Sequence, residues 1–207
     1  MKKKIHKYDF LIIGAGLIGS LAALALYQKK FKVLVVDKAP KNLQDNRTLA
    51  VNANSKDFLI QLGIWNKLKS KPQPINKIII KDYINTDQLI FENNEESMGN
   101  VVLNKEVLKE AKKMCLKKKI LINNLALDYN NISENNLITI KQSIYQFKKV
   151  ILCIGKNLKL NAFKDKNNQF SHVGFFDHSK THNNIAYEIF TKTGPLAVLP
   201  SPDKNNL

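Results

Sequence analysis

The hydrophobic positions of the chain fall into short blocks, and the first three blocks predict a β-α-β unit. Residues 8–13 form an apolar run of strand length, residues 17–27 follow a helical pattern, and residues 31–36 form a second apolar run. Two buried strands joined by one helix are typical of a parallel sheet. We therefore expect an α/β fold that begins with a parallel pair of strands.

Later blocks predict two more helices and a series of strands. Asn54 or Ser55 can cap a helix that Gly63 ends, and Asn104 can cap a helix over residues 105–119. The inward-facing residues expected around the first of these helices are Leu59, Leu62 and Trp65. Strands are expected at 75–83 and 88–91, which can pair with each other. Further strands are expected at 120–127, in a hairpin of 137–140 with 144–147, and at 149–154, where the chain returns to the parallel sheet.

Three glycines stand between the first strand and the first helix with the spacing G-x-G-x-x-G. Gly14 allows a sharp turn, Gly16 leaves room for a diphosphate against the backbone, and Gly19 lets the helix lie close to the sheet. The free N–H groups and the positive dipole end at the start of the helix favour phosphate. Asp37 follows Gly19 by 18 residues, where a carboxylate can accept hydrogen bonds from ribose hydroxyls. This combination predicts a dinucleotide site.

The same region admits a second interpretation, a secretory signal or a short membrane span. The lysines at positions 2–4 would form its charged start, and residues 10–27 would form its apolar stretch. Against this, Asp9 and the three glycines interrupt the pattern, and no convincing small-residue cleavage site follows. We therefore favour the nucleotide fold.

The composition is that of a globular protein with a strong basic excess. The formal net charge is +16, but nearly all of the positive charge is lysine, and Arg47 is the only arginine. The lysines are mostly scattered, whereas proteins that recognise phosphate tend to use the arginine fork. We therefore expect no nucleic-acid partner. Attraction to an anionic membrane surface stays open as the alternative to a plain solvated surface.

Cysteine and histidine give no sign of a metal site. Cys115 and Cys153 lie far apart and outside any metal or redox spacing, so they predict free thiols in a reducing compartment. His172, His178 and His182 cluster in one segment, but no accompanying ligand pattern makes them more than loop histidines. We expect a cytoplasmic protein, and peripheral contact with the inner face of the membrane stays open.

Two later patterns extend the glycine motif into a family resemblance. Residues 45–50 read D-x-R-x-x-A, and the serine-led helix that follows ends in L-G-x-W. Residues 182–190 read H-x-x-x-A-Y-E-x-F, and residues 194–200 read G-P-L-A-V-L-P. Together these patterns resemble the ubiquinone-biosynthesis hydroxylases, which are FAD-dependent aromatic monooxygenases of the para-hydroxybenzoate hydroxylase type. The resemblance covers essentially all of the chain.

The resemblance implies a Rossmann-like FAD-binding domain, with a parallel sheet and a β-meander, and a partial substrate domain built on a mixed sheet. It assigns residues 1–71 and 101–160 to the first domain and residues 72–100 and 161–207 to the second. It implies FAD, an external reductant that is NAD(P)H or an electron-transfer protein, and a polyprenyl phenol whose ring is hydroxylated. The cofactor-binding residues expected are Gly14, Ala15, Gly16, Gly19, Asp37, Lys38 and Arg47.

The arginine of D-x-R-x-x-A lies against the flavin dinucleotide in that family, so the resemblance gives Arg47 this role. A planar fork of donors suits phosphate and carbonyl oxygens. The alternative for Arg47 is a surface ion pair with Asp45. No residue can be nominated as a catalytic acid or base from the sequence, because Asp82, Tyr83 and Glu92 are each better explained as surface residues.

The sequence departs from the family in two places. The family's A-D-G is replaced by residues 153–157, which read C-I-G-K-N, so the acidic residue is missing. The family also continues beyond G-P-L-A-L-L-P to a G-D-A-A-H motif, and this sequence does not contain that motif. We therefore expect a chain truncated at its C-terminus, in which residues 196–199 form an unpaired apolar strand.

Three functional hypotheses follow from these departures. The chain is part of an FAD-dependent hydroxylase that a second polypeptide completes, or it is a non-catalytic truncated remnant. The third hypothesis is a separate dinucleotide-binding module of a membrane-associated complex. The altered A-D-G favours the remnant, whereas the intact first and last motifs favour the hydroxylase.

Overall fold

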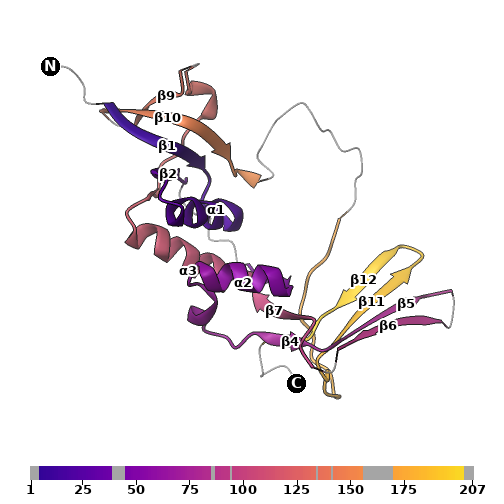
Figure 1. Cartoon of the computed structure of the whole chain (residues 1–207). Helices are drawn as coiled ribbons and strands as arrows, with labels where there is room; N and C mark the ends of the chain where they lie inside the picture. The colour runs from indigo at the N-terminus through magenta and orange to yellow at the C-terminus, as the bar shows by residue number, and fades with distance from the viewer. Residues whose placement is uncertain are drawn as a thin grey trace. The chain divides into compact units, whose positions relative to one another are not determined.

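The structure, a computed structural model, forms two compact units, which we describe separately (Figure 1). The residues that it describes are 5–38, 45–84, 87–93, 95–133, 135–140, 142–155 and 170–202. The first unit consists of Met1–Gln44 and Leu108–Phe170, and the second consists of Asp45–Val107 and Ser171–Leu207. Lys156 and Asn157, the last two residues of the segment that replaces the family's A-D-G, lie outside the described residues.

The first unit contains a five-stranded sheet with the order β8-β2-β1-β10-β9. Its strands are β1 (Ile5–Ile13), β2 (Val33–Val36), β8 (Leu121–Ile122), β9 (Leu137–Ile140) and β10 (Ser143–Leu152). Four of these strands are parallel, and β9 pairs with β10 in the antiparallel direction. The helices of this unit are α1 (Leu17–Gln28), the short 3₁₀ helix η2 (Tyr129–Asn131) and the part of α3 (Asn104–Lys117) that follows Val107.

Buried apolar residues of β1, β2, β9 and β10 form a core cluster of the first unit. All four residues of β2 are buried, as is the C-terminal end of β1. Such continuous burial is typical of a parallel strand that is covered on both faces. On α1 the buried residues are mostly small, namely Gly19, Ser20, Ala23 and Leu24. Small side chains on this face allow the helix to lie close to the sheet.

The second unit contains a three-stranded antiparallel sheet with the order β3-β7-β4. Its strands are β3 (Thr48–Val51), β4 (Gln73–Ile75) and β7 (Gly99–Leu103), of which β7 is buried along its whole length. Helix α2 (Ala53–Gln61) and the short 3₁₀ helix η1 (Trp65–Lys67) follow β3. The side-chain oxygen of Asn52 accepts a hydrogen bond from the N–H of Ser55 and so caps α2.

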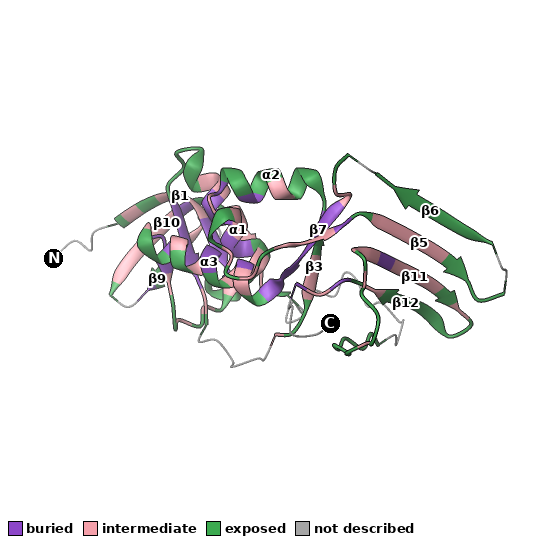
Figure 2. Ribbon diagram, turned by 90° about the horizontal axis from the view of Figure 1, so that it is seen from below, coloured by how far each residue is buried: buried purple, intermediate pink, exposed green. Residues whose placement is uncertain are grey.

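The second unit also contains a four-stranded mixed sheet with the order β12-β11-β5-β6. Its strands are β5 (Lys77–Asp82), β6 (Gln88–Glu92), β11 (Ile185–Thr191) and β12 (Gly194–Val198). The pair β11 and β5 is parallel, and the other two pairs are antiparallel. In Figure 2, β7 of the three-stranded sheet is purple, whereas β6 at the edge of the mixed sheet is green and therefore exposed.

The predicted fold class is confirmed, since the chain combines a mostly parallel α/β sheet with a separate mixed sheet. The first three predicted elements are present, and residues 10–27 are divided by a turn at the glycines instead of forming one helix. The predicted pairing of 88–91 with the strand before it is also confirmed.

Several local predictions were wrong. The predicted hairpin strand at 144–147 and the strand at 149–154 are one strand, β10, which pairs with β9 along one edge and with β1 along the other. In the predicted strand 120–127 only Leu121–Ile122 is extended in a sheet. Helix α2 begins at Ala53 and is capped by Asn52. The predicted burial of Leu59 and Leu62 is confirmed, whereas Trp65 is only half-buried and Ile64 is buried instead.

Residues 196–199 are not an unpaired strand, which corrects another expectation. Leu196 lies opposite Ile189, because β12 turns back onto β11 and forms an antiparallel hairpin with it. The turn uses Gly194, whose φ of 137° is a conformation that other residues rarely adopt. The apolar residues of β12 thus have a backbone partner on one side, although most of them are exposed.

The two compact units divide the chain at other positions than the two domains expected from the resemblance. Residues 45–71 and 101–107 group with the second unit, because β3 and β4 both pair with β7. The functional division into an FAD-binding and a substrate domain stays a prediction.

Candidate functional site

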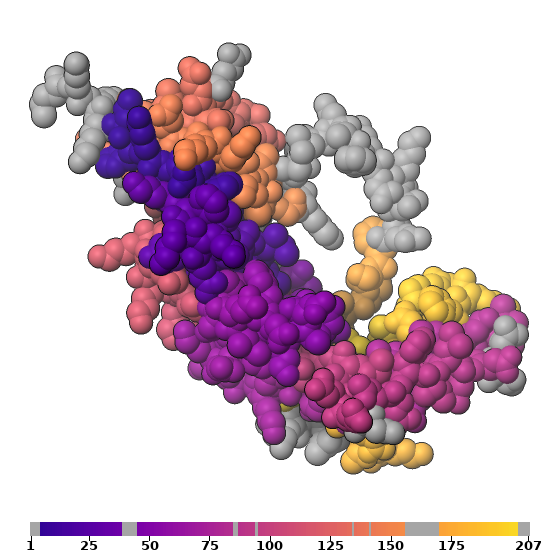
Figure 3. Space-filling view, in the orientation of Figure 1, coloured from indigo at the N-terminus to yellow at the C-terminus, as the bar shows by residue number. Residues whose placement is uncertain are grey.

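A cavity of about 400 Å³ lies at the C-terminal end of the parallel sheet in the first unit. Segments far apart in the sequence meet there, since β1 pairs with β10 and β2 pairs with β1 (Figure 3, indigo and orange). Its lining residues are Ile13, Gly14, Gly16, Val36, Asp37, Lys38, Leu125, Ala126, Leu127, Asp128, Tyr129, Cys153, Ile154 and Gly155. In doubly wound α/β folds, ligands bind at this end of the strands.

Gly14 and Gly19 shape the turn that borders this cavity. Gly14 has a φ of 102°, and a Cβ there would lie 2.4 Å from the carbonyl oxygen of Cys153. A Cβ on Gly19 would lie 2.0 Å from the carbonyl oxygen of Gly14. Both positions therefore require glycine for the fold itself, whatever binds in the cavity.

Gly16 differs from the other two glycines, because a Cβ there would meet no atom within 4 Å. The backbone at Gly16 faces open space and lines the cavity. Gly16 is also the N-cap of α1, and this helix begins with no side-chain cap and no acidic residue in its first turn. Its first N–H groups, together with the helix dipole, can therefore bind an anion.

Asp37 lies at the end of β2 with both carboxylate oxygens in contact with other groups. The N–H of Ala15 donates to Oδ1 at 3.1 Å, and the ammonium of Lys112 donates to Oδ2 at 2.8 Å. The Asp37 and Lys112 side chains are 15% and 23% exposed, so the ion pair is mostly shielded from solvent. A carboxylate has about four acceptor positions, which leaves capacity for ribose hydroxyls.

The structure thus brings most of the predicted site residues together. Gly14, Gly16, Asp37 and Lys38 line one cavity. Ala15 and Gly19 are buried beside it and hold its shape through the Asp37 contact and the close helix packing. Their role in cofactor binding stays a prediction.

Sequence reasoning missed several residues of this site. Lys112 is one of them, because no spacing in the sequence links it to Asp37, 75 residues away. Cys153, Asp128 and Tyr129 also line the cavity. Burial raises the pKa of the Cys153 thiol, so this residue is a poor nucleophile at neutral pH.

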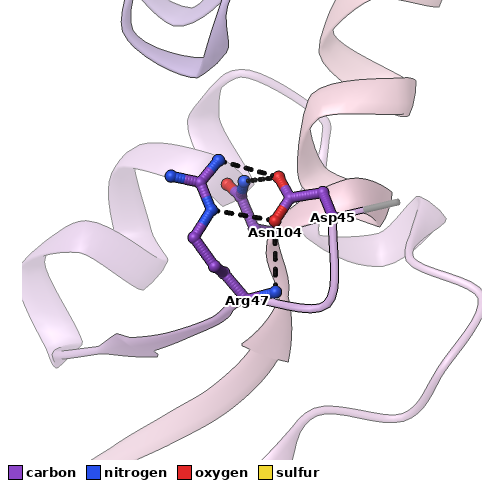
Figure 4. A network of polar contacts seen from close by, with 3 residues as sticks. All are labelled: Asp45, Arg47 and Asn104. Atoms are coloured by element: carbon purple, nitrogen blue, oxygen red, sulfur yellow. Dashed lines mark hydrogen bonds and ion pairs between the residues drawn. The ribbon is translucent and has the colours of Figure 1, made fainter. Parts of the chain in front are cut away.

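Arg47, the remaining predicted residue, belongs to the second unit. Its guanidinium forms two hydrogen bonds with the carboxylate of Asp45, at 2.8 and 2.9 Å, and its backbone N–H donates to the same carboxylate (Figure 4). The amide of Asn104 also donates to Asp45. The ion pair that the sequence left open is therefore present, while the arginine side chain is 68% exposed.

The guanidinium of Arg47 strongly favours the ionised form of Asp45. Its hydrogen bond is the largest cause that lowers the pKa of Asp45 to about 2, and the hydrogen bonds from the Arg47 N–H and from Asn104 act in the same direction. Partial burial of the carboxyl opposes this shift. At neutral pH the pair is fully charged.

A larger cavity, of about 700 Å³, lies in the second unit. Its lining combines aromatic and apolar side chains with a group of polar residues, namely Phe175, Phe176, His178, Lys180, Thr181, His182, Asn183, Ile185, Tyr187, Val198, Leu199, Pro200 and Ser201. Two of the histidines noted in the sequence are among them. Within the described part of the chain, no group of three or more potential metal ligands lies together.

The part of the chain that contains the glycine turn matches a known protein family. A family profile described as "FAD binding domain" matches residues 7–124, more than half of the chain. The chain belongs to this FAD-binding domain family. The matched region includes the glycine turn, Asp37 and Lys112.

Relatives of this chain include enzymes of ubiquinone biosynthesis. It is 25% identical to the ubiquinone biosynthesis monooxygenase COQ6 of Caenorhabditis elegans, over 95% of this chain and 50% of the relative. It is 26% identical to the ubiquinone hydroxylase UbiL of Rhodospirillum rubrum, over 94% of this chain and 49% of the relative. The chain therefore spans about half the length of these relatives.

Solved structures share the fold at low sequence identity. A variant of PqsL from Pseudomonas aeruginosa superimposes with a TM-score of 0.61, at 11% identity, over 88% of this chain and 54% of that protein. A geranylgeranyl bacteriochlorophyll reductase-like protein from Thermoplasma acidophilum superimposes with a TM-score of 0.60, at 16% identity, over 95% of this chain and 54% of that protein. These similarities support the fold class.

The glycine turn and Asp37 fit the adenosine diphosphate portion of FAD. They offer an open backbone at Gly16, an uncapped helix start for phosphate and a carboxylate at the end of β2.

None of the helices in the described ranges combines the length and the apolar character needed to cross a bilayer.

Proposed function

We propose that this chain is the FAD-binding part of a flavin-dependent hydroxylase that acts on the ring of a polyprenyl phenol in ubiquinone biosynthesis. The observation that carries the proposal is the glycine turn, in which Gly14 and Gly19 are required sterically while Gly16 faces open space. The similarity to COQ6 and UbiL over nearly the whole chain supports the reaction class.

In this proposal the start of α1 and Asp37 bind the adenosine diphosphate part of FAD. The N–H groups at the start of α1 bind the diphosphate, and Asp37 accepts hydrogen bonds from the adenosine ribose. Lys38 lies at the rim of the cavity, exposed to solvent. Bound FAD, reduced by NAD(P)H or by an electron-transfer protein, supplies the redox chemistry, and this chain's residues supply binding and orientation.

The second cavity is our candidate for part of the phenol-binding surface. Phe175, Phe176 and Tyr187 offer apolar contact, and His178 and His182 offer polar atoms to orient a ring hydroxyl. Peripheral contact with a membrane would give access to a substrate that carries a polyprenyl chain.

Replacing Gly16 by valine tests the cofactor site. Since a Cβ at this position meets no protein atom, Gly16→Val should leave the melting temperature of the cofactor-free chain nearly unchanged. The same side chain would occupy the space of the diphosphate, so the affinity for FAD, measured by flavin fluorescence quenching, should fall at least about tenfold.

Gly174→Val is the matched control, because Gly174 also has no atom within 4 Å of an added Cβ and lies outside the first cavity. It should bind FAD like the unaltered chain. Equal FAD affinities of the two variants, or an unaltered chain that binds no FAD, would contradict the proposal.

The altered A-D-G motif favours a second candidate, a dinucleotide-binding module without hydroxylase activity. Cys153 and Gly155 line the cavity, and no acidic residue stands between them. If the flavin half contributes nothing to binding, ADP should bind as tightly as FAD. A clear preference for FAD over ADP would favour the hydroxylase instead.

A further inference from the structure

We propose that Lys112 is a positioning residue of the dinucleotide site, which holds the Asp37 carboxylate and cancels its negative charge beside the position of the diphosphate. This inference rests on the proposed cofactor site. Lys112 does not line the cavity itself, so it acts through Asp37.

The contacts of Asp37 connect three elements. Its Oδ1 accepts from the N–H of Ala15 in the glycine turn, and its Oδ2 accepts from Lys112 on α3. With one oxygen bound on each side, the carboxylate has a fixed orientation at the end of β2. A fixed acceptor loses less conformational freedom when a ribose hydroxyl binds to it.

Helix α3 is itself fixed against the turn that forms the cavity. Ala111 and Cys115, on either side of Lys112 in the sequence, are fully buried. The Sγ of Cys115 donates to the carbonyl oxygen of Ser20, and the Ser20 hydroxyl donates to the carbonyl oxygen of Ala15. These contacts hold the backbone of Lys112 in a fixed position close to Asp37.

A positive charge is needed beside Asp37 because its carboxylate lies near the proposed position of the diphosphate. The Asp37 carboxylate contacts the N–H of Ala15, next to the uncapped helix start at which the anionic diphosphate would bind. An unpaired carboxylate here would repel the diphosphate, and the low exposure of the pair limits screening by water and salt. The other charged residues that line the cavity are Asp128 and Lys38, and Lys38 is exposed.

The neighbouring Lys113 provides a matched control on the same helix. Its side chain is 73% exposed and lies 3.7 Å from Glu110, so it takes no part in the Asp37 contact. Lys113→Gln removes the same charge from the same chain and should leave FAD affinity unchanged.

Lys112→Gln should weaken FAD binding about tenfold, whereas Lys112→Arg should restore most of the affinity. Binding of ADP should fall by a similar factor, because ADP carries the diphosphate. Binding of adenosine, which has the ribose but no phosphate, should fall much less. The melting temperature of each cofactor-free variant shows whether the fold has changed.

The outcomes separate this inference from the proposed function. If the unaltered chain binds no FAD, the proposed function fails. If it binds FAD but Lys112→Gln binds FAD and ADP equally well, the inference about Lys112 is wrong and the proposed function stands. Equal losses for adenosine and ADP, or no rescue by Lys112→Arg, would also overturn charge compensation as the role of Lys112.

Discussion

The parallel sheet of the first unit and the mixed sheet of the second unit carry similar apolar side chains but bury them very differently. Every residue of β2 is buried, and Leu11 and Ile12 of β1 are fully enclosed. In the mixed sheet, Leu89 of β6 is 63% exposed and Leu196 of β12 is 52% exposed. The first sheet therefore derives stability from its core, whereas strands β6 and β12 of the second sheet gain little from apolar burial.

This difference matches the two candidate roles. A cofactor cradle needs a rigid backbone, since Gly14 and Gly19 must keep contact distances that leave no room for a side chain. A surface for an apolar substrate needs exposed apolar residues, and large exposed apolar patches typically mark interaction sites. The following predictions test how far the contrast holds, beginning with the largest expected effect.

A pair of leucine-to-alanine changes tests the contrast in burial directly. Leu11→Ala removes a fully buried side chain from β1 and should cost about 3 kcal/mol of unfolding free energy. Leu196→Ala removes a half-exposed side chain from β12 and should cost less than about 1 kcal/mol. Urea denaturation followed by circular dichroism measures both. Similar costs for the two variants would show that β12 has a core of its own.

A thiol-labelling experiment compares the two cavities. Cys153 lines the first cavity, and burial raises the pKa of its thiol, so alkylation should be slow at neutral pH and accelerate in alkaline solution. ADP should slow this labelling several-fold. Cys115 should stay unmodified in the folded chain, because it is fully buried and its pKa is raised to about 11.

For the second cavity, Thr181→Cys in a Cys153→Ala background places the thiol among its lining residues. ADP should leave the labelling rate of this thiol unchanged, because the nucleotide is expected only in the first cavity. Protection of both thiols by ADP would remove the distinction between the two cavities.

The smallest effect is expected at the ion pair between Arg47 and Asp45 in the second unit. Arg47→Gln breaks an exposed pair and should change the unfolding free energy at pH 7 by less than about 1 kcal/mol. In this variant the pKa of Asp45 should rise from about 2 toward its ordinary value of 3.8, which NMR titration can measure. An unchanged pKa would mean that the Arg47 N–H and Asn104 are sufficient to hold the carboxylate.

The sign of the accompanying pH effect follows from the lowered pKa. The stability that Asp45 contributes is fully present above pH 3.8, where the carboxyl is ionised in both the folded and the unfolded chain. It is lost as the pH falls from 3.8 to about 2. Arg47→Gln should therefore flatten the pH dependence of stability in this acid range and leave it unchanged near neutrality.

The sequence alone determined the glycine turn, the first β-α-β unit and the carboxylate at the end of β2. These features depend on local causes: glycine's freedom at positive φ, the period of apolar positions and the short distance between a strand end and the next helix. The same kind of reasoning gave the pairing of β5 with β6, since few residues separate them in the sequence. It divided β10 in two, because the adjacent lysines Lys148 and Lys149 interrupt the apolar pattern of that strand.

Only the tertiary structure decided which distant segments meet. The parallel pairing of β11 with β5 joins residues about a hundred positions apart, and the Lys112–Asp37 contact joins residues 75 positions apart. A periodic pattern tells which face of an element is apolar, but not which other element will cover it. Lysines are frequent in this chain, so nothing local distinguishes Lys112 from Lys113. The packing of α3 against α1 alone brings one of them to Asp37 and leaves the other in solvent.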